Sequence, residues 1–369
     1  MIRSSLESEI YILQGRYTRY QAGPDAVKKR TILIASAVTL LLVFAAYRLK
    51  GSSFQWGLFL STIYNVDWRW LTLSIALVLL SYVGRAVRWE VMLRPLRSGI
   101  SIRKLTSDTT IGFTAVVLLG RPGELVRPYL ISLSTGLSFS SQMAAWILER
   151  ILDLLAVLLL FGFALIRIPA QGLALGPGLR WVLGTGGYLI SGLGALAVLL
   201  FIVFRNFSDA AQRRILGAVG FLPESQRKRI EKMLQTFSEG MESTRNGRLF
   251  ALLLGYTALE WLIIVTSYYA LLHALPATST FSITNVVIML GFVAFAGVVQ
   301  IPGIGGGVQI ASIVVLSEIY KTPMAAATAA ALVIWIITFV VVVPVGFACA
   351  FHEGINWSKL KHLPQDVPL

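Results

Sequence analysis

Long apolar runs alternate with short polar and basic segments along this chain. Six runs are long enough to cross a bilayer core of about 30 Å as helices, namely residues 31–47, 70–87, 143–166, 181–204, 250–272 and 325–351. Hydrophobic residues make up 56% of the chain and charged residues 14%, and the mean hydropathy is +0.73. Soluble domains do not have this composition. The pattern predicts an all-α integral membrane protein, a polytopic helical bundle of about six full spans.

Two further apolar stretches are interrupted. Residues 109–119 are too short for a span, and residues 286–316 are cut by the Pro/Gly-rich segment 301–307. Loops rich in Lys and Arg face the cytoplasm. This rule places 1–29, 84–104, 205–248 and 352–369 inside, and 167–180 and 273–281 outside. These positions agree only if each interrupted segment enters and leaves the membrane on one side.

The sequence therefore predicts two re-entrant hairpins, 105–141 from the cytoplasm and 282–322 from the outside. A span, a hairpin and a span then occur twice with opposite orientation, in repeat halves 70–166 and 250–351. Paired broken helices in inverted repeats mark transport sites near the midplane of the membrane. The alternative is that 282–322 forms one long tilted span with a Gly/Pro kink.

This pattern divides the chain into three parts. We expect a cytoplasmic N-terminal segment at 1–29 and a cytoplasmic tail at 352–369. Between them lies a transmembrane domain at 30–351, which includes a basic cytoplasmic loop at 205–248.

The segment G-R-P-G-E-L-V-R-P at 120–128 places two arginines and a carboxylate on a Pro/Gly-broken turn. Broken backbone at membrane depth is tolerated only where protein or a water-filled cavity surrounds it. One interpretation is that Arg121 and Arg127 hold a lipid phosphate while Glu124 orients one of them. Arg127 lies one helical turn beyond Glu124 and within its reach. The alternative is that the three charges neutralise one another in a structural network.

Four ionisable residues inside the predicted spans are further candidates for substrate binding. Glu149 and Asp153 share a helix face, and Arg150 can pair with Asp153. Glu260 lies near the middle of its span. Charges at this depth cost about 2.5–3.5 kcal/mol each, so they usually pair and face inward. Three roles are open for Glu149 and Asp153: counter-ions for the arginines of the turn, a proton relay, or part of a structural ion pair. Glu260 pairs with one of those arginines or titrates as a coupling group.

The Pro/Gly-rich segment opens onto a second half-helix near Val308. Backbone N–H groups at such a helix end point outward and favour anions. The predicted substrate-binding residues here are Gln300, Gly305, Gly306, Gly307 and Gln309. The two amides add hydrogen-bonding groups without negative charge. The alternative is that the glycines only permit close helix packing.

Two further patterns predict contact with the membrane surface. Arg85, Arg88 and Trp89 follow an apolar run, and we expect them to be snorkelling anchors. Within 222–245, four apolar residues recur at helical spacing, namely Ile230, Leu234, Phe237 and Met241. A helix of this kind in the basic loop 205–248 can lie on an anionic leaflet. A solvated loop helix is the alternative.

Several other classes of function lack support in the chain. The formal net charge is +14, but the basic residues flank spans, so we expect no nucleic-acid partner. Cys349 is the only cysteine, which excludes a disulfide framework and a thiolate metal cluster. The sequence contains no H-E-x-x-H, G-x-S-x-G or Walker A motif. We therefore expect neither an enzyme nor a bound metal or cofactor.

Four motifs resemble the lysylphosphatidylglycerol synthase transmembrane-region family, also described as flippase-like. They are R-A-V-R-W at 85–89, G-R-P-G-E-L-V-R at 120–127, E-R-I-L-D at 149–153 and I-P-G-I-G-G-G at 301–307. The similarity covers most of 30–351. It implies a helical bundle with re-entrant elements, tied to moving charged or glycosylated lipids between leaflets.

Two departures from the family pattern bear on substrate and activity. The family's second turn usually runs P-G-G-x-G-x-x-E, whereas Gln309 takes the acidic position here. That change favours an anionic headgroup over a cationic aminoacyl one. Residues 352–369 hold no counterpart of the synthases' aminoacyl-transferase domain, so we expect no synthase activity.

The combined patterns predict a lipid transporter or flippase of a bacterial-type cytoplasmic (inner) membrane, with both termini cytoplasmic. It would move an anionic or phosphate-bearing lipid, either a phospholipid or a polyprenyl-linked or other glycolipid, between leaflets. The alternatives are an integral-membrane lipid transferase, a transporter of a small anion, and a non-transporting scaffold for envelope lipid synthesis. The sequence leaves a homo-oligomer open.

Overall fold

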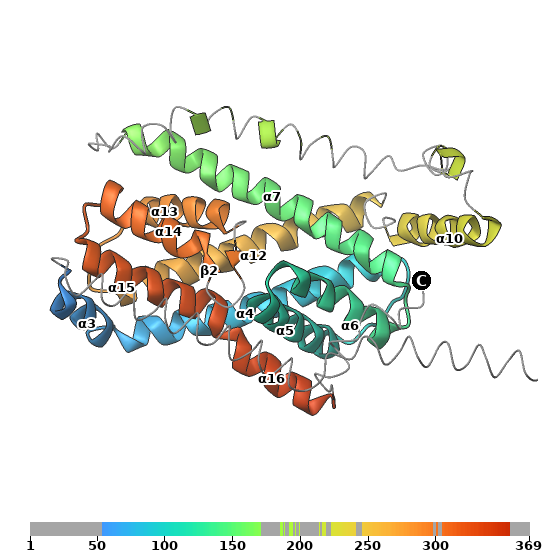
Figure 1. Ribbon diagram of the computed structural model, residues 1–369, viewed down its shortest axis with the longest axis horizontal. Helices are drawn as coiled ribbons and strands as arrows, with labels where there is room; N and C mark the ends of the chain where they lie inside the picture. The colour runs from blue at the N-terminus through green and yellow to red at the C-terminus, as the bar shows by residue number, and fades with distance from the viewer. Residues whose placement is uncertain are drawn as a thin grey trace, which may run out of the picture. The chain divides into compact units, whose positions relative to one another are not determined.

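The computed structural model describes residues 54–170, 223–240, 246–297, 300–301 and 305–354, with scattered residues between 185 and 218. The predicted span 31–47 and about two thirds of the predicted span 181–204 lie outside the described residues. Within them the chain is helical apart from one pair of two-residue strands (Figure 1). The prediction of an all-α fold is confirmed for this part of the chain.

Four of the described helices are long and apolar enough to cross a membrane. They are α4 (Trp68–Leu93), α7 (Phe139–Ala170), α12 (Gly247–Ala274) and the continuous helix Met324–His352. The last consists of α15 (Met324–Trp335), a π-helical turn (Ile336–Val340) and α16 (Val342–His352). The four helices coincide with the apolar runs predicted at 70–87, 143–166, 250–272 and 325–351. The chain is a multi-pass membrane protein.

The first interrupted segment is a helical hairpin. Helix α5 (Ile102–Leu119) ends at Gly120, whose positive φ of 70° suits glycine. A short 3₁₀ turn, η1 (Arg121–Leu125), then leads into α6 (Val126–Thr135). At Gly123 a side chain would collide with the backbone of Ala115, so this glycine lets the turn fold back on α5.

The second interrupted segment repeats this plan. Helix α13 (Ile283–Ala296) is followed by β1 (Gln300–Ile301) and β2 (Gly305–Gly306), which pair antiparallel. Helix α14 (Gly307–Val314) and a π-helical turn (Val315–Ile319) complete it. The backbone reverses at Gly306, where φ is 122°. Both segments predicted to be broken hairpins are therefore pairs of helices joined by a Gly-rich turn.

Helices α4 and α12 run antiparallel along most of their length. Near the start of α4, the N–H of Asp67 donates to the carbonyl of Ala274 at 2.9 Å, just at the end of α12. About two helical turns further along α4, the Ser74 hydroxyl donates to the carbonyl of Ser267 at 2.9 Å. The contact continues towards the opposite ends of both helices, where the site described below lies.

Each hairpin packs against the last long helix of the other half of the chain. Helix α13 lies on α7, and helix α5 lies on α16 (Figure 1). A glycine permits the close approach at both crossings. A Cβ at Gly291 would lie 2.8 Å from the carbonyl oxygen of Leu160, and one at Gly346 would lie 2.7 Å from that of Thr110. The two halves of the chain therefore interlock.

Two smaller helices complete the described part. Helix α3 (Trp56–Tyr64) packs against α15. Helix α10 (Glu224–Gly240) confirms the helix predicted in 222–245, with Ile230 and Leu234 half-buried and Arg227, Lys228 and Lys232 exposed. Met241 lies outside the described residues. The contact of this helix with an anionic leaflet stays a prediction.

The close approach of the helices at these two crossings predicts that the stability of the protein depends on the glycines there. We expect Gly291→Val and Gly346→Val each to lower the stability of the detergent-solubilised protein by about 1–3 kcal/mol, because the added atoms force the helices apart. Gly255→Val is the matched control, since a Cβ there meets open space on the exposed face of α12. The measurement is thermal unfolding followed by size-exclusion chromatography. Equal midpoints for all three variants would contradict the close packing.

Candidate functional site

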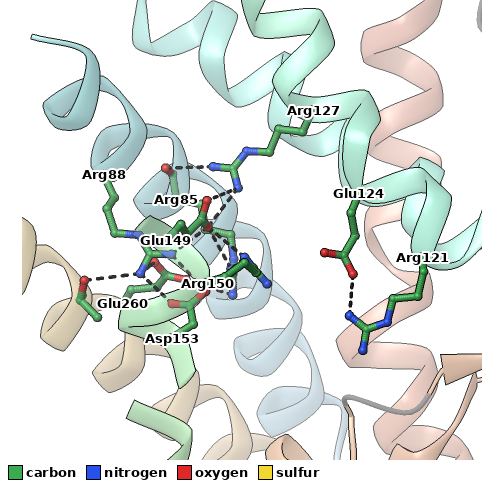
Figure 2. Close-up of polar contacts among 10 residues, drawn as sticks. Arg85, Arg88, Arg121, Glu124, Arg127, Glu149, Arg150, Asp153 and Glu260 are labelled. Carbon is green, nitrogen blue, oxygen red and sulfur yellow. Dashed lines mark hydrogen bonds and ion pairs between the residues drawn. The ribbon is translucent and has the colours of Figure 1, made fainter. Parts of the chain in front are cut away.

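Seven ionisable side chains from four helices converge beside the α4–α12 contact (Figure 2). We call this group the arginine–carboxylate cluster; it consists of Arg85, Arg88, Arg127, Glu149, Arg150, Asp153 and Glu260. Helical spacing aligns its members, because residues three or four apart share a face. Helix α4 contributes the first two, α6 one, α7 three and α12 the last.

Arg88 lies at the centre of the cluster and contacts all three carboxylates. Its Nη2 is 2.7 Å from Glu149, and its Nη1 is 2.8 Å from Asp153 and 3.3 Å from Glu260. Its Nη1 also lies 3.4 Å from the hydroxyl of Thr257 on α12. Arg88 and Glu149 have no solvent exposure, and Glu260 has 1%. This buried guanidinium ties α4 to both α7 and α12.

Arg127 reaches the cluster from the first hairpin. Its Nη1 donates to both carboxylate oxygens of Glu149, at 2.8 and 3.0 Å. Its guanidinium lies 4.1 Å from the ring centre of Trp89, a cation–π contact. Gly112 on α5 makes room for it, since a Cβ there would lie 2.5 Å from that of Arg127. The hairpin thus delivers one cation into the protein interior.

Trp89 is itself held in place. Its Nε1 donates to the side-chain oxygen of Gln142 at 3.0 Å, and neither residue has solvent exposure. The indole ring therefore has a fixed orientation beneath the guanidinium of Arg127. Sequence reasoning missed Gln142, which carries no motif that would identify it.

One edge of the cluster is accessible. Arg150 has 39% of its side chain exposed, Arg85 15% and Asp153 13%. Arg150 lies 3.2 Å from Asp153 and 3.3 Å from Glu149, which confirms the predicted pairing with Asp153. Arg85 reaches Glu260 at 3.0 Å. The deep members are thus sealed in protein while two arginines remain within reach from outside.

The structure separates the two arginines of the first turn. Arg121 Nη1 lies 2.7 Å from Glu124, and this half-exposed pair stands apart from the cluster (Figure 2). Arg127 instead points to Glu149. The arginine that Glu124 pairs with is therefore Arg121, and the turn places the side chain of Arg127 away from Glu124. Of the predicted counter-ion pairs, the one between Arg127 and Glu149 is confirmed.

The role predicted for Arg85, Arg88 and Trp89 is also wrong. They are not snorkelling anchors, because Arg88 and Trp89 are completely buried and Arg85 pairs with Glu260. Glu260 accordingly pairs with the two arginines of α4 and not with those of the turn in the first hairpin. The R-x-x-R spacing was the available signal, because it puts both guanidiniums on one face of a long apolar helix.

Hydrogen bonds within the second hairpin hold its turn in place. The side-chain oxygen of Gln309 accepts a hydrogen bond from the N–H of Gly306 at 2.7 Å, and Gln300 pairs with Gly306 across the short strands. Gly305 and Gly307 flank this reversal. A substrate role for these residues stays a prediction.

The cluster suits charge recognition better than proton transfer. Glu149 lies within 4 Å of four arginines, Asp153 of three and Glu260 of two. Oxygen atoms shared among several guanidiniums are less available to accept a proton, which makes Glu149 and Asp153 poor bases. Among the described residues, no group of three His, Cys, Asp or Glu side chains is arranged to hold a metal ion.

Comparisons with known proteins agree with the membrane fold. Glycosyltransferase AglD of Haloferax volcanii is 24% identical over 267 residues, which cover 68% of this chain and 42% of that protein. The chain thus corresponds to less than half of this relative's length. No solved structure is significantly similar to it. The sequence profile of the lysylphosphatidylglycerol synthase transmembrane region matches residues 32–346, and the chain therefore belongs to that family.

Proposed function

We propose that this protein binds an anionic phospholipid or glycolipid by its headgroup and moves it between the leaflets of a cytoplasmic membrane. The observation that carries the proposal is the arginine–carboxylate cluster, in which four guanidiniums gather among apolar helices and two remain accessible. Arginine is suited to phosphate because its planar fork of donors matches the oxygen atoms. The acyl chains would stay in the bilayer.

The depth of the cluster supports a transport role. Glu260 lies halfway along α12, and Asp153 lies near the middle of α7. Ionisable groups at the middle of a membrane-spanning helix usually mark a pathway for substrate or ions. A purely structural role would be served at lower cost by apolar residues, since replacing a buried ion pair with them is often neutral or stabilising.

The arrangement of the halves supports alternating access. A long helix, a hairpin and a long helix occur twice, and the two leading helices, α4 and α12, run antiparallel. We propose that they belong to an inverted repeat whose hairpins are re-entrant, with both termini cytoplasmic. Inverted repeats that rock around a central site are common in transporters. Glu260 belongs to one half and the six other members of the cluster to the other.

A lipid transferase is the second candidate, and the printed name of the Haloferax volcanii relative favours it. In that case Glu149 or Asp153 would act as general base. Their close pairing with arginines argues against this role. Incubating the purified protein with a membrane lipid and nucleotide-activated sugars, followed by mass spectrometry, distinguishes the two. We expect no new glycolipid, and formation of one would replace the transport proposal.

Arg127 provides the direct test of lipid movement. In proteoliposomes carrying fluorescent phosphatidylglycerol, we expect Arg127→Gln to slow movement between leaflets at least about tenfold, since it removes a charge-assisted contact. The variant should fold, because Glu149 keeps its contacts with Arg88 and Arg150. The readout is the fraction of lipid protected from an impermeant quencher over time.

The matched control for this test is Arg94→Gln. Arg94 pairs with Glu90 outside the cluster and lies on the same helix as Arg88. We expect wild-type rates for this control. A wild-type rate for Arg127→Gln as well, with both proteins monodisperse, would remove the cluster from the transport path.

The re-entrant hairpins make a topological prediction. In a Cys349→Ser background, we expect single cysteines at Ser98 and Ser138, which flank the first hairpin, to react with impermeant maleimide only from the cytoplasmic side. Cysteines at Ser279 and Lys321, which flank the second, should react only from the outside. Labelling of Ser279→Cys and Lys321→Cys from opposite sides would instead mean that 282–322 crosses the membrane once.

A further inference from the structure

The arginine–carboxylate cluster does not balance its own charge. Among the described residues it contains four arginines and three carboxylates, so its formal charge is +1. Charges removed from water are costly unless they are paired. The shared contacts of Arg88 and Glu149 spread the surplus over the group but do not remove it. The cluster is short of one negative charge.

Among the residues that the structure describes, no neighbouring carboxylate forms an ion pair with the cluster. Arg121 pairs with Glu124, and Arg94 pairs with Glu90. Lys104, Asp108 and Glu353 form a separate group, in which the amine of Lys104 contacts both carboxylates. That group joins the start of α5 to the end of α16, and Lys104 is 39% exposed. Asp108 is buried, but this group forms no ion pair with the cluster.

The cluster also has unused hydrogen-bond donors. The Nε atoms of Arg88, Arg127 and Arg150 are buried and have no hydrogen-bond partner among the described residues. An unpaired buried donor is costly, because it has lost its hydrogen bonds to water. A phosphate group carries several acceptor oxygens and one or more negative charges. At the accessible edge it would supply the missing negative charge and an acceptor for the Nε of Arg150.

We propose that the cluster selects a lipid headgroup with a single net negative charge, the phosphodiester class. The proposal rests on the transport function above and narrows its substrate. One such charge neutralises the group, and Arg85 and Arg150 at the accessible edge are placed to meet it. A zwitterionic headgroup adds a cation for which no carboxylate is left over. A phosphomonoester adds a second negative charge that lacks a partner.

The first experiment measures which lipid the purified protein retains. The protein is incubated at pH 8 with an equimolar mixture of phosphatidylglycerol, phosphatidylcholine and phosphatidic acid, and bound lipid is quantified by mass spectrometry. At that pH the phosphomonoester carries close to two charges, because its second pKa is about 6. We expect phosphatidylglycerol to be retained at least about tenfold over each of the others.

Variants that change the charge count test the cause of the selectivity. Arg150→Gln brings the cluster to zero charge, and we expect phosphatidylglycerol retention to fall to the phosphatidylcholine level. Asp153→Asn raises the charge to +2 and should shift the preference to phosphatidic acid. The double variant Arg150→Gln/Asp153→Asn restores +1 and should restore phosphatidylglycerol. Both residues lie at the accessible edge, and Arg88 keeps its contacts with Glu149 and Glu260 in every variant.

Arg94→Gln is the matched control for Arg150→Gln. Arg94 is 40% exposed and Arg150 39%, and each pairs with a carboxylate on its own helix. We expect the control to bind lipid as the wild type does. Loss of selectivity in the control as well would mean that surface charge governs retention, and would overturn the proposal.

The remaining outcomes separate the substrate class from the function. Equal retention of phosphatidylglycerol and phosphatidic acid, or a double variant that fails to recover, overturns the charge-matching proposal and leaves lipid transport standing. Equal retention of all three lipids, together with no lipid movement in proteoliposomes, overturns the transport function itself.

Discussion

The contact of one buried guanidinium with three carboxylates holds the centre of this protein together. Arg88 joins α4 to α7 through Glu149 and Asp153, and to α12 through Glu260. Removing one partner of such a buried pair costs about 3–5 kcal/mol, because the other charge is left uncompensated. The relative position of these three long helices therefore depends on the cluster as much as on apolar packing, which is weak as a driving force within lipid.

The positions of the hairpins depend on small residues, just as the positions of the long helices depend on ion pairs. Gly123 lets the first turn fold onto α5, and Gly112 gives Arg127 the space to reach Glu149. Gly291 and Gly346 let each hairpin approach the far half of the chain. Without a hydrophobic driving force between helices in a membrane, close backbone approach supplies much of the packing energy. The glycines thus position the charges.

The order of helices occurs twice in the chain, but the two hairpins carry different functional side chains. The first hairpin carries Arg127 into a charged cluster, whereas the second presents a glycine turn closed by the amide of Gln309. A moving headgroup would therefore meet strong charge on one side of the junction between the halves and neutral hydrogen-bonding groups on the other. In the proposed transport function, such asymmetry would let one step of the cycle hold the substrate and the other release it.

Apolar runs and Gly/Pro breaks determined the architecture from the sequence alone: four long helices, two helix–turn–helix segments and the acidic positions on α7 and α12 were all predicted. Most of the pairing between charged residues was not. Only the tertiary structure showed that Arg88 is buried and that Arg121 and Arg127 point to different partners. Hydrophobic periodicity reports which residues share a helix face, but not which helix meets that face. Ion pairs between helices distant in sequence form only once the bundle is packed.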